Sequence, residues 1–193
     1  FKASVSRGPD NYKYNFFNKN FIFFHRLSIN GLNDDSNQPF NINNIELICN
    51  GEIYNYKNLF KNINYKSTTN SDCEIILYLY IKYGIEYTLN LLDGVFAFVL
   101  IDHNINQIFV ARDPHGVRPL YYLSNSREIL SDNYHNKKHT SLICFSSEIK
   151  QLIGFANKFN HYDNHEMEND YLLIQPVQPG EYLCLELSEN DYK

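Results

Sequence analysis

The sequence lacks the features that mark membrane, secreted and nucleic-acid-binding proteins. No apolar run reaches the length of about 18 residues that a transmembrane helix requires, and the first residues do not form a signal peptide. Lys and Arg form no basic stripe and the formal net charge is −5, which argues against nucleic acid as a partner. No glycine-rich phosphate-binding loop is present. We therefore expect neither a membrane nor a nucleic-acid partner.

The cysteine pattern does not indicate a disulfide framework. The cysteines, at positions 49, 73, 144 and 184, show no CxxC spacing. Three lie in strand-like runs and Cys73 lies at a helix start, which favours buried free thiols over disulfides. Free thiols fit a reducing compartment, and we expect a cytoplasmic location.

The chain has no initiator methionine, and residues 1–5 look like the tail of a helix already under way. We therefore expect a fragment of a longer protein. With 193 residues and 44% hydrophobic content, one full core is possible. We expect one domain over residues 1–187 and the start of a linker over residues 188–193.

Hydrophobic periodicity and turn residues predict mixed α and β structure. Ser71 and Glu74 form a capping box that would start a helix, and Gly84 would end it. Two polar stretches, 124–140 and 157–169, are expected to be insertions. Strands are expected at 21–29, 45–49, 94–101, 107–112, 117–123, 141–145 and 182–187, and helices at 56–61, 75–83, 86–92 and 148–153.

The strand expected at 94–101 is apolar on both faces, so it must be covered on both sides. The simplest arrangement is two mainly antiparallel sheets packed on each other with helices outside. The expected fold class is therefore α+β, in a four-layer αββα sandwich.

The stretch Asn50-Gly51-Glu52 follows the apolar run at 45–49 and could form a small binding site. Gly51 would leave its N–H exposed, the Asn50 amide can donate hydrogen bonds, and the Glu52 carboxylate can accept them. Such groups could hold a zwitterion and an oxyanion that forms on it. The alternative is a plain hairpin turn, which Asn-Gly strongly favours.

Two further charged residues could complete this site. Arg26 lies within a strand pattern, where it could clamp a carboxylate or could extend to solvent. Asp72 lies at a helix start, where it could accept from an ammonium group or could stabilise the helix dipole. With Glu52 and the Asn50-Gly51 donors, they would describe a site for an α-amino acid whose side-chain carbonyl is attacked.

Other polar groups are weaker candidates. We expect Arg112 and Asp113 to form a structural pair in a charged turn. The histidine pairs 135 with 139 and 161 with 165 lie in polar, Asn-rich stretches, so we expect no metal site. Cys49 and Cys73 have no obvious base, and packing explains each better than a role as nucleophile.

Eight motifs in the sequence carry a resemblance to a known family. They are RGPD at 7–10, FHRLSIN at 24–30, CNGEIYNYKNL at 49–59, SDCEIILYLYIKYGIE at 71–86, LDGVFAFVLID at 92–102, ARDPHGVRPLYY at 111–122, SSEIKQL at 146–152 and PGEYL at 179–183. Their order and spacing resemble those of the class-II glutamine amidotransferase domain of asparagine synthetases. The GVFAFVLID and RDPHGVRPL segments look most like those of the eukaryotic type.

The resemblance implies an N-terminal-nucleophile hydrolase fold that hydrolyses L-glutamine at an N-terminal cysteine, whose own α-amino group is the base. Asn50 and Gly51 would form the oxyanion hole, and Arg26 would hold the substrate carboxylate. No cofactor is implied for this domain; ATP and Mg²⁺ would serve a C-terminal synthetase domain, and a homodimer is possible. The implied glutamine-binding residues are Arg26, Leu27, Ser28, Ile29, Asn30, Asn50, Gly51, Glu52 and Asp72.

The sequence also departs from the family pattern. The cysteine nucleophile and its strand, which lie upstream of RGPD in the family, are missing, and Ser6 stands where a histidine usually precedes that motif. The synthetase domain is missing downstream. We therefore expect the chain alone to bind glutamine weakly and not to hydrolyse it. The alternative is a scaffold or interface domain of the same fold that lost its nucleophile, and another class-II amidotransferase is a further rival.

Overall fold

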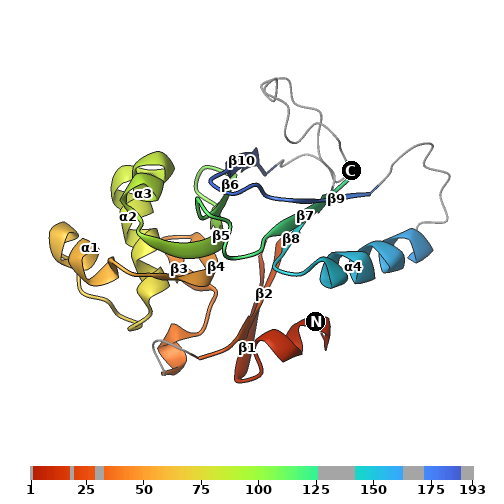
Figure 1. The fold of residues 1–193 in the computed structure, drawn as a ribbon, viewed down its shortest axis with the longest axis horizontal. Coiled ribbons are helices and arrows are strands. Elements are labelled where there is room, and N and C mark those ends of the chain that lie inside the picture. The colour runs from red at the N-terminus through yellow and green to blue at the C-terminus, as the bar shows by residue number, and fades with distance from the viewer. Residues whose placement is uncertain (1, 18–19, 29–32, 126–141, 163–171, 188–193) are drawn as a thin grey trace.

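The computed structural model describes residues 2–17, 20–28, 33–125, 142–162 and 172–187, and Figure 1 shows their arrangement. The 3₁₀ helices are η1 (Lys2–Arg7), η2 (Asp34–Ser36) and η3 (Asp72–Glu74). The α-helices are α1 (Tyr56–Ile63), α2 (Ile75–Tyr83), α3 (Ile85–Leu91) and α4 (Ile149–Tyr162). The strands are β1 (Asn11–Phe17), β2 (Asn20–Arg26), β3 (Phe40–Ile42), β4 (Ile45–Ile53), β5 (Gly94–Asp102), β6 (Gln107–Arg112), β7 (Tyr121–Ser124), β8 (Ile143–Ser146), β9 (Leu173–Pro176) and β10 (Tyr182–Glu186).

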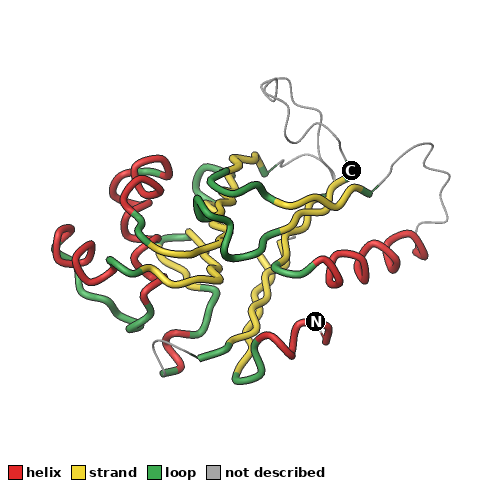
Figure 2. The backbone as a smooth tube through the Cα atoms, viewed as in Figure 1, coloured by secondary structure: helices red, strands yellow, loops and turns green. Residues whose placement is uncertain are grey.

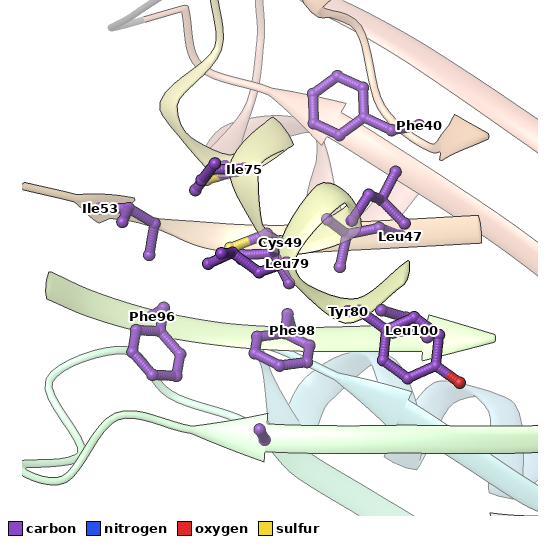
Figure 3. Packing of buried hydrophobic residues seen from close by; sticks show 14 of the residues in the cluster. Phe40, Leu47, Cys49, Ile53, Ile75, Leu79, Tyr80, Phe96, Phe98 and Leu100 are labelled. Carbon is purple, nitrogen blue, oxygen red and sulfur yellow. The ribbon is translucent and has the colours of Figure 1, made fainter. Parts of the chain in front are cut away.

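The central sheet is antiparallel and has the order β10-β6-β5-β4-β3. Its middle strand, β5, is buried on both faces, as the sequence predicted. Phe96, Phe98 and Leu100 pack with α1 and α2 on one face, and Figure 3 shows this core at close range. Ala97 and Val99 belong to the core on the opposite face.

The second β layer covers that opposite face. It consists of the hairpin β1-β2 and a separate sheet of order β8-β7-β9. Ile22 of β2 and Tyr122 of β7 both pack in the core that they share with the central sheet. Helix α4 lies against β7 and β8 on the outer side, so helices flank the strands at both ends of the molecule (Figure 2). The predicted αββα order is confirmed, although the second layer is split into two sheets.

Several element boundaries differ from those predicted. Helix α4 continues to Tyr162 and therefore includes the start of the expected polar insertion at 157–169. Strand β7 begins only at Tyr121, because the preceding residues form the loop that Arg112 and Asp113 hold. The rest of that insertion, at 163–169, lies outside the described residues. The same holds for residues 126–140 of the insertion expected at 124–140.

The prediction of a capping box is wrong, because the expected side-chain hydrogen bonds between Ser71 and Glu74 do not form. Ser71 makes no side-chain cap bond and accepts the Glu74 N–H through its backbone carbonyl at 3.4 Å. The Glu74 carboxylate turns to the preceding loop instead. The predicted end of α2 at Gly84 is confirmed: Gly84 has a φ of 78° and donates its N–H to the Tyr80 carbonyl at 2.8 Å.

Candidate functional site

Asn50 and Gly51 lie inside β4, where they pair with Ala97 and Phe96 of β5. The expected turn at this point is therefore wrong. Glycine is required here for close approach: a Cβ on Gly51 would lie 2.4 Å from the Val95 carbonyl oxygen and 2.7 Å from the Phe96 Cα. Real side chains do not tolerate such contacts with backbone atoms, so Gly51 allows β4 and β5 to come together.

The backbone N–H of Gly51 points away from β5, toward the outer edge of β4. The Phe96 carbonyl accepts from the Asp113 N–H at 2.8 Å, so the polar groups of Phe96 face β6. Its partner Gly51 must then face the other way in an antiparallel ladder. The Cys73 Sγ lies 3.7 Å from the Gly51 carbonyl oxygen on that side. Within the described ranges no residue accepts the Gly51 N–H, which leaves this donor open for a ligand.

The side chains of Asn50 and Glu52 project toward the second β layer. Side chains alternate along a strand, and Leu47, Cys49 and Ile53 belong to the core on the helix side. Asn50 and Glu52, which are both half-buried, therefore lie on the other face. The Asn50 amide and the Gly51 N–H are thus adjacent donors at the end of one strand.

Arg26 ends β2 in the facing layer. It lies four residues after Ile22, which packs between the layers, so Arg26 is on the same face of its strand. Only 7% of Arg26 is exposed, and Nη1 donates to the Asn33 carbonyl at 3.0 Å and to Asn37 Oδ1 at 2.8 Å. The alternative in which Arg26 extends to solvent is therefore wrong.

The residues after Arg26 are only partly described. Leu27 is 56% exposed. The Ser28 N–H donates to Asp10 Oδ2 at 2.7 Å, which ties this segment to the RGPD turn. Ile29 and Asn30, predicted to bind glutamine, lie outside the described residues.

Asp72 is buried at the start of η3 and binds the end of β4. Its Oδ2 accepts from the Ile53 N–H at 2.7 Å, two residues beyond Gly51. Sequence reasoning considered an ammonium group or the helix dipole and missed this backbone partner. The contact places the Asp72 carboxylate beside the open edge of β4.

Ser36 joins the segment that holds Arg26 to the loop that carries Asp72. Its Oγ donates to Asn33 Oδ1 at 2.6 Å and also contacts the Thr69 carbonyl. Asn33 in turn accepts from Arg26 through its backbone. The segments bearing the predicted site residues therefore form one connected hydrogen-bonding network around the end of β4.

Glu74 anchors the loop at 67–70 that precedes Asp72. Its buried carboxylate accepts from Ser67 Oγ at 2.6 Å, from the Thr68 N–H at 3.1 Å and from the Thr69 N–H at 3.1 Å. Burial alone would raise the pKa of Glu74, but the bonds from Ser67, Thr68 and Thr69 outweigh it and lower the pKa. The loop therefore depends on an ionised Glu74.

Replacing Glu74 with glutamine is expected to destabilise the domain by about 2 kcal/mol, because charged hydrogen bonds to a buried acceptor are lost. Urea unfolding of wild type and variant at pH 7 measures this difference, and amide exchange at Thr68 and Thr69 should accelerate. The folded-state pKa is depressed, so the contribution is complete above the unfolded pKa of about 4.3 and is lost as pH falls through the folded value. A difference that grows on acidification would contradict this account.

The cysteines are all free, but only Cys49 and Cys73 are buried. The expectation of burial is wrong for Cys184, which is exposed, and Cys144 is half-buried. A hydrogen bond with Cys49 and burial hold the pKa of the Cys73 thiol well above its usual range. Cys73 therefore remains a protonated thiol near neutral pH and is not an activated nucleophile.

The expected pair between Arg112 and Asp113 is wrong, because each side chain binds backbone groups instead. Arg112 donates to the carbonyls of Gly116, Arg118 and Val177 at 2.7 to 2.8 Å. Burial alone would raise the pKa of Asp113, but N–H groups of the same loop, donated by Arg118, Val117 and His115, lower it. Both residues hold the loop between β6 and β7.

The described residues contain no cluster of His, Cys, Asp and Glu that could hold a metal ion. Of the two histidine pairs, positions 135, 139 and 165 lie outside the described residues. No helix in the described part of the chain is long and apolar enough to cross a membrane.

Proteins of similar sequence found by comparison are named as asparagine synthetases. The chain is 37% identical over 188 residues to a probable glutamine-hydrolysing asparagine synthetase of Acanthamoeba polyphaga mimivirus, covering 95% of this chain and 29% of the relative. It is 34% identical over 194 residues to the enzyme of Mesocricetus auratus, covering 95% of this chain and 30% of the relative. It is 32% identical over 207 residues to asparagine synthetase 2 of Bacillus subtilis, covering 97% and 26%. The chain therefore spans less than a third of the length of these relatives.

A solved structure shares the fold. The glutamine phosphoribosylpyrophosphate amidotransferase of B. subtilis matches with a TM-score of 0.50 and 20% identity, over 81% of this chain and 33% of that one. This likeness supports the N-terminal-nucleophile hydrolase fold that the motifs predicted. The family model described as glutamine amidotransferase domain matches residues 1–187. The chain therefore belongs to the glutamine amidotransferase domain family.

Proposed function

We propose that this chain is the glutamine-hydrolysing domain of a glutamine-dependent asparagine synthetase. The relatives at 32–37% identity bear that name. The observation that carries the proposal is the open edge of β4, where the Gly51 N–H has no described acceptor and lies beside the Asn50 amide. A tetrahedral oxyanion is stabilised by hydrogen-bond donors of this kind, and these two belong to neighbouring residues.

The proposed reaction begins with attack on the side-chain carbonyl of glutamine by a cysteine thiolate. By the resemblance, this cysteine precedes the RGPD turn, and its own α-amino group takes the thiol proton. The carbonyl oxygen becomes an oxyanion that accepts from the Asn50 amide and the Gly51 N–H. As the tetrahedral intermediate collapses, the α-ammonium group returns its proton to the leaving nitrogen, the C–N bond breaks and ammonia departs. Water then hydrolyses the thioester, which releases glutamate and restores the thiol.

Charged residues near the donors are proposed to hold the substrate backbone. Arg26 lies in the facing β layer and suits the α-carboxylate, because a guanidinium matches a carboxylate with paired donors. Asp72 lies beside the edge of β4 and Glu52 lies on its face, and both carboxylates suit the α-ammonium group. Leu27, Ser28, Ile29 and Asn30 remain predicted contacts.

The whole protein is proposed to pass ammonia to a C-terminal synthetase domain that uses ATP and Mg²⁺ to convert aspartate into asparagine. The test is an assay of the full-length protein with glutamine or with ammonium chloride, each with and without aspartate and ATP. We expect glutamate release from glutamine, and asparagine from both nitrogen sources. Asparagine formed from ammonia alone, with no glutamate released from glutamine, would instead indicate a non-catalytic scaffold domain.

Replacing Arg26 with lysine tests the carboxylate clamp. Lysine keeps the charge but cannot form the planar paired bonds, so the KM for glutamine is expected to rise about tenfold or more with a smaller change in kcat. Steady-state kinetics of glutamate release measure both constants. Lys13→Arg, on the adjacent strand β1, is the control and should leave KM unchanged. An unaltered KM in Arg26→Lys would remove Arg26 from the binding site.

A further inference from the structure

The pairing of β3 with β4 ends just before the open donor. In this ladder Ile42 pairs with Ile45 and Phe40 pairs with Leu47. If β3 continued in the same register, residue 38 would lie opposite Cys49 and residue 36 opposite Gly51. A strand at that place would take up the Gly51 N–H. The chain instead turns away into η2.

The side chain of Gln38 takes the place of the next strand residue. Its Oε1 accepts from the Cys49 N–H at 2.6 Å, and its Nε2 donates to the Cys49 carbonyl at 3.0 Å. Both bonds are buried, and Gln38 is only 6% exposed. One primary amide therefore supplies the donor and the acceptor that a strand would have offered to Cys49.

The backbone on the other side of Gly51 is held in a similar way. The Ile53 N–H donates to Asp72 Oδ2 at 2.7 Å. Ser36, which a longer β3 would bring to Gly51, bonds with Asn33 and Thr69 instead. Side chains thus fix the backbone at Cys49 and at Ile53, while the N–H of Gly51 between them has no acceptor among the described residues.

We propose that Gln38 is a positioning residue for glutamine hydrolysis: its amide ends the β3 ladder one pair before Gly51 and holds the Gly51 N–H in place for the oxyanion. Gln38 does not touch the substrate in this proposal and acts through β4. The inference rests on the proposed function. Because the geometry of an oxyanion donor affects the transition state more than substrate binding, its effect should fall on kcat.

The test replaces Gln38 with methionine in the full-length protein, which keeps the volume and removes both hydrogen bonds. We expect kcat for glutamate release to fall about tenfold or more, since small misplacements of catalytic groups have effects up to about a hundredfold. KM for glutamine and the Ki of the product glutamate should stay within about threefold of their wild-type values. Asparagine formation from ammonium chloride should be unchanged.

Counting active sites separates positioning from loss of folded protein. The glutamine analogue 6-diazo-5-oxo-L-norleucine alkylates the nucleophile, and its stoichiometry at completion gives the fraction of competent sites. A positioning role lowers kcat per labelled site. A merely structural role lowers the number of labelled sites and leaves kcat per site at the wild-type value, which would overturn the proposal.

A second variant and a control keep the test decisive. Gln38→Leu also removes both bonds but with a different side-chain shape, so kcat per site should fall as it does in Gln38→Met. Gln151→Ala removes a half-buried side-chain amide that is bonded to Ser146 on the far side of the molecule, and it should behave as wild type. If neither Gln38 variant can be labelled while Gln151→Ala can, Gln38 is a folding residue and the proposal fails. If the wild-type protein releases no glutamate, the proposed function fails first.

Discussion

Asn50→Ala in the full-length protein is expected to lower kcat for glutamine hydrolysis by roughly a hundredfold or more. Removal of one oxyanion donor typically costs about 3 kcal/mol of transition-state stabilisation. Asn50 is half-buried on the face of β4 that meets the second β layer, and alanine at this position offers no donor in place of the amide. The measurement is glutamate release per active site, with KM determined separately.

The same variant should form asparagine from ammonium chloride at the wild-type rate, because that reaction bypasses the oxyanion. Asn55→Ala is the matched control, at the residue that directly precedes α1. The Asn55 side chain donates to the Leu91 carbonyl at 2.8 Å and accepts from the Asp93 N–H at 3.2 Å, so its loss should reduce stability and spare kcat. Unchanged glutamine turnover in Asn50→Ala would end the assignment of Asn50 as an oxyanion donor.

The layered architecture could be predicted because its signal is local. The run from Val95 to Ile101 is apolar at every position, and only a strand covered on both faces tolerates that pattern. In the structure its two faces belong to two different cores, as expected. The short strands β3 and β9 were harder to predict. Neither β3 nor β9 exceeds four residues, and each is stabilised mainly by the partner with which it pairs.

The roles of the polar residues depended on partners that the sequence does not reveal. Asn-Gly is a strong turn signal, yet Gly51 lies in a strand because Val95 and Phe96 approach it closely. Glu74 was expected to cap its own helix, but its carboxylate holds the loop before it. Gln38 lies in a polar connection with no local signal at all, and only the register of β3 against β4 brings its amide to Cys49. Local patterns thus indicated which segments matter but not which atoms meet.

Gly51→Ala is expected to remove glutamine hydrolysis almost completely and to destabilise the domain. The added methyl group would lie 2.4 Å from the Val95 carbonyl oxygen and 2.7 Å from the Phe96 Cα, and backbone atoms cannot rotate away as a side chain can. Relief requires β4 to separate from β5, which moves the Gly51 N–H. We expect a loss of about 3 kcal/mol from overpacking and a fall in kcat of about a hundredfold or more.

Gly154→Ala provides the matched control, because the same methyl group at Gly154 in α4 would meet no atom within 4 Å. Removing a glycine from a helix interior favours folding by up to about 1 kcal/mol, so this variant should be slightly more stable and fully active. Urea unfolding and kcat per labelled site compare the two variants directly. If Gly51→Ala matched Gly154→Ala in both measurements, β4 and β5 would not be in the close contact that gives the Gly51 N–H its position, and the oxyanion site would have to lie elsewhere.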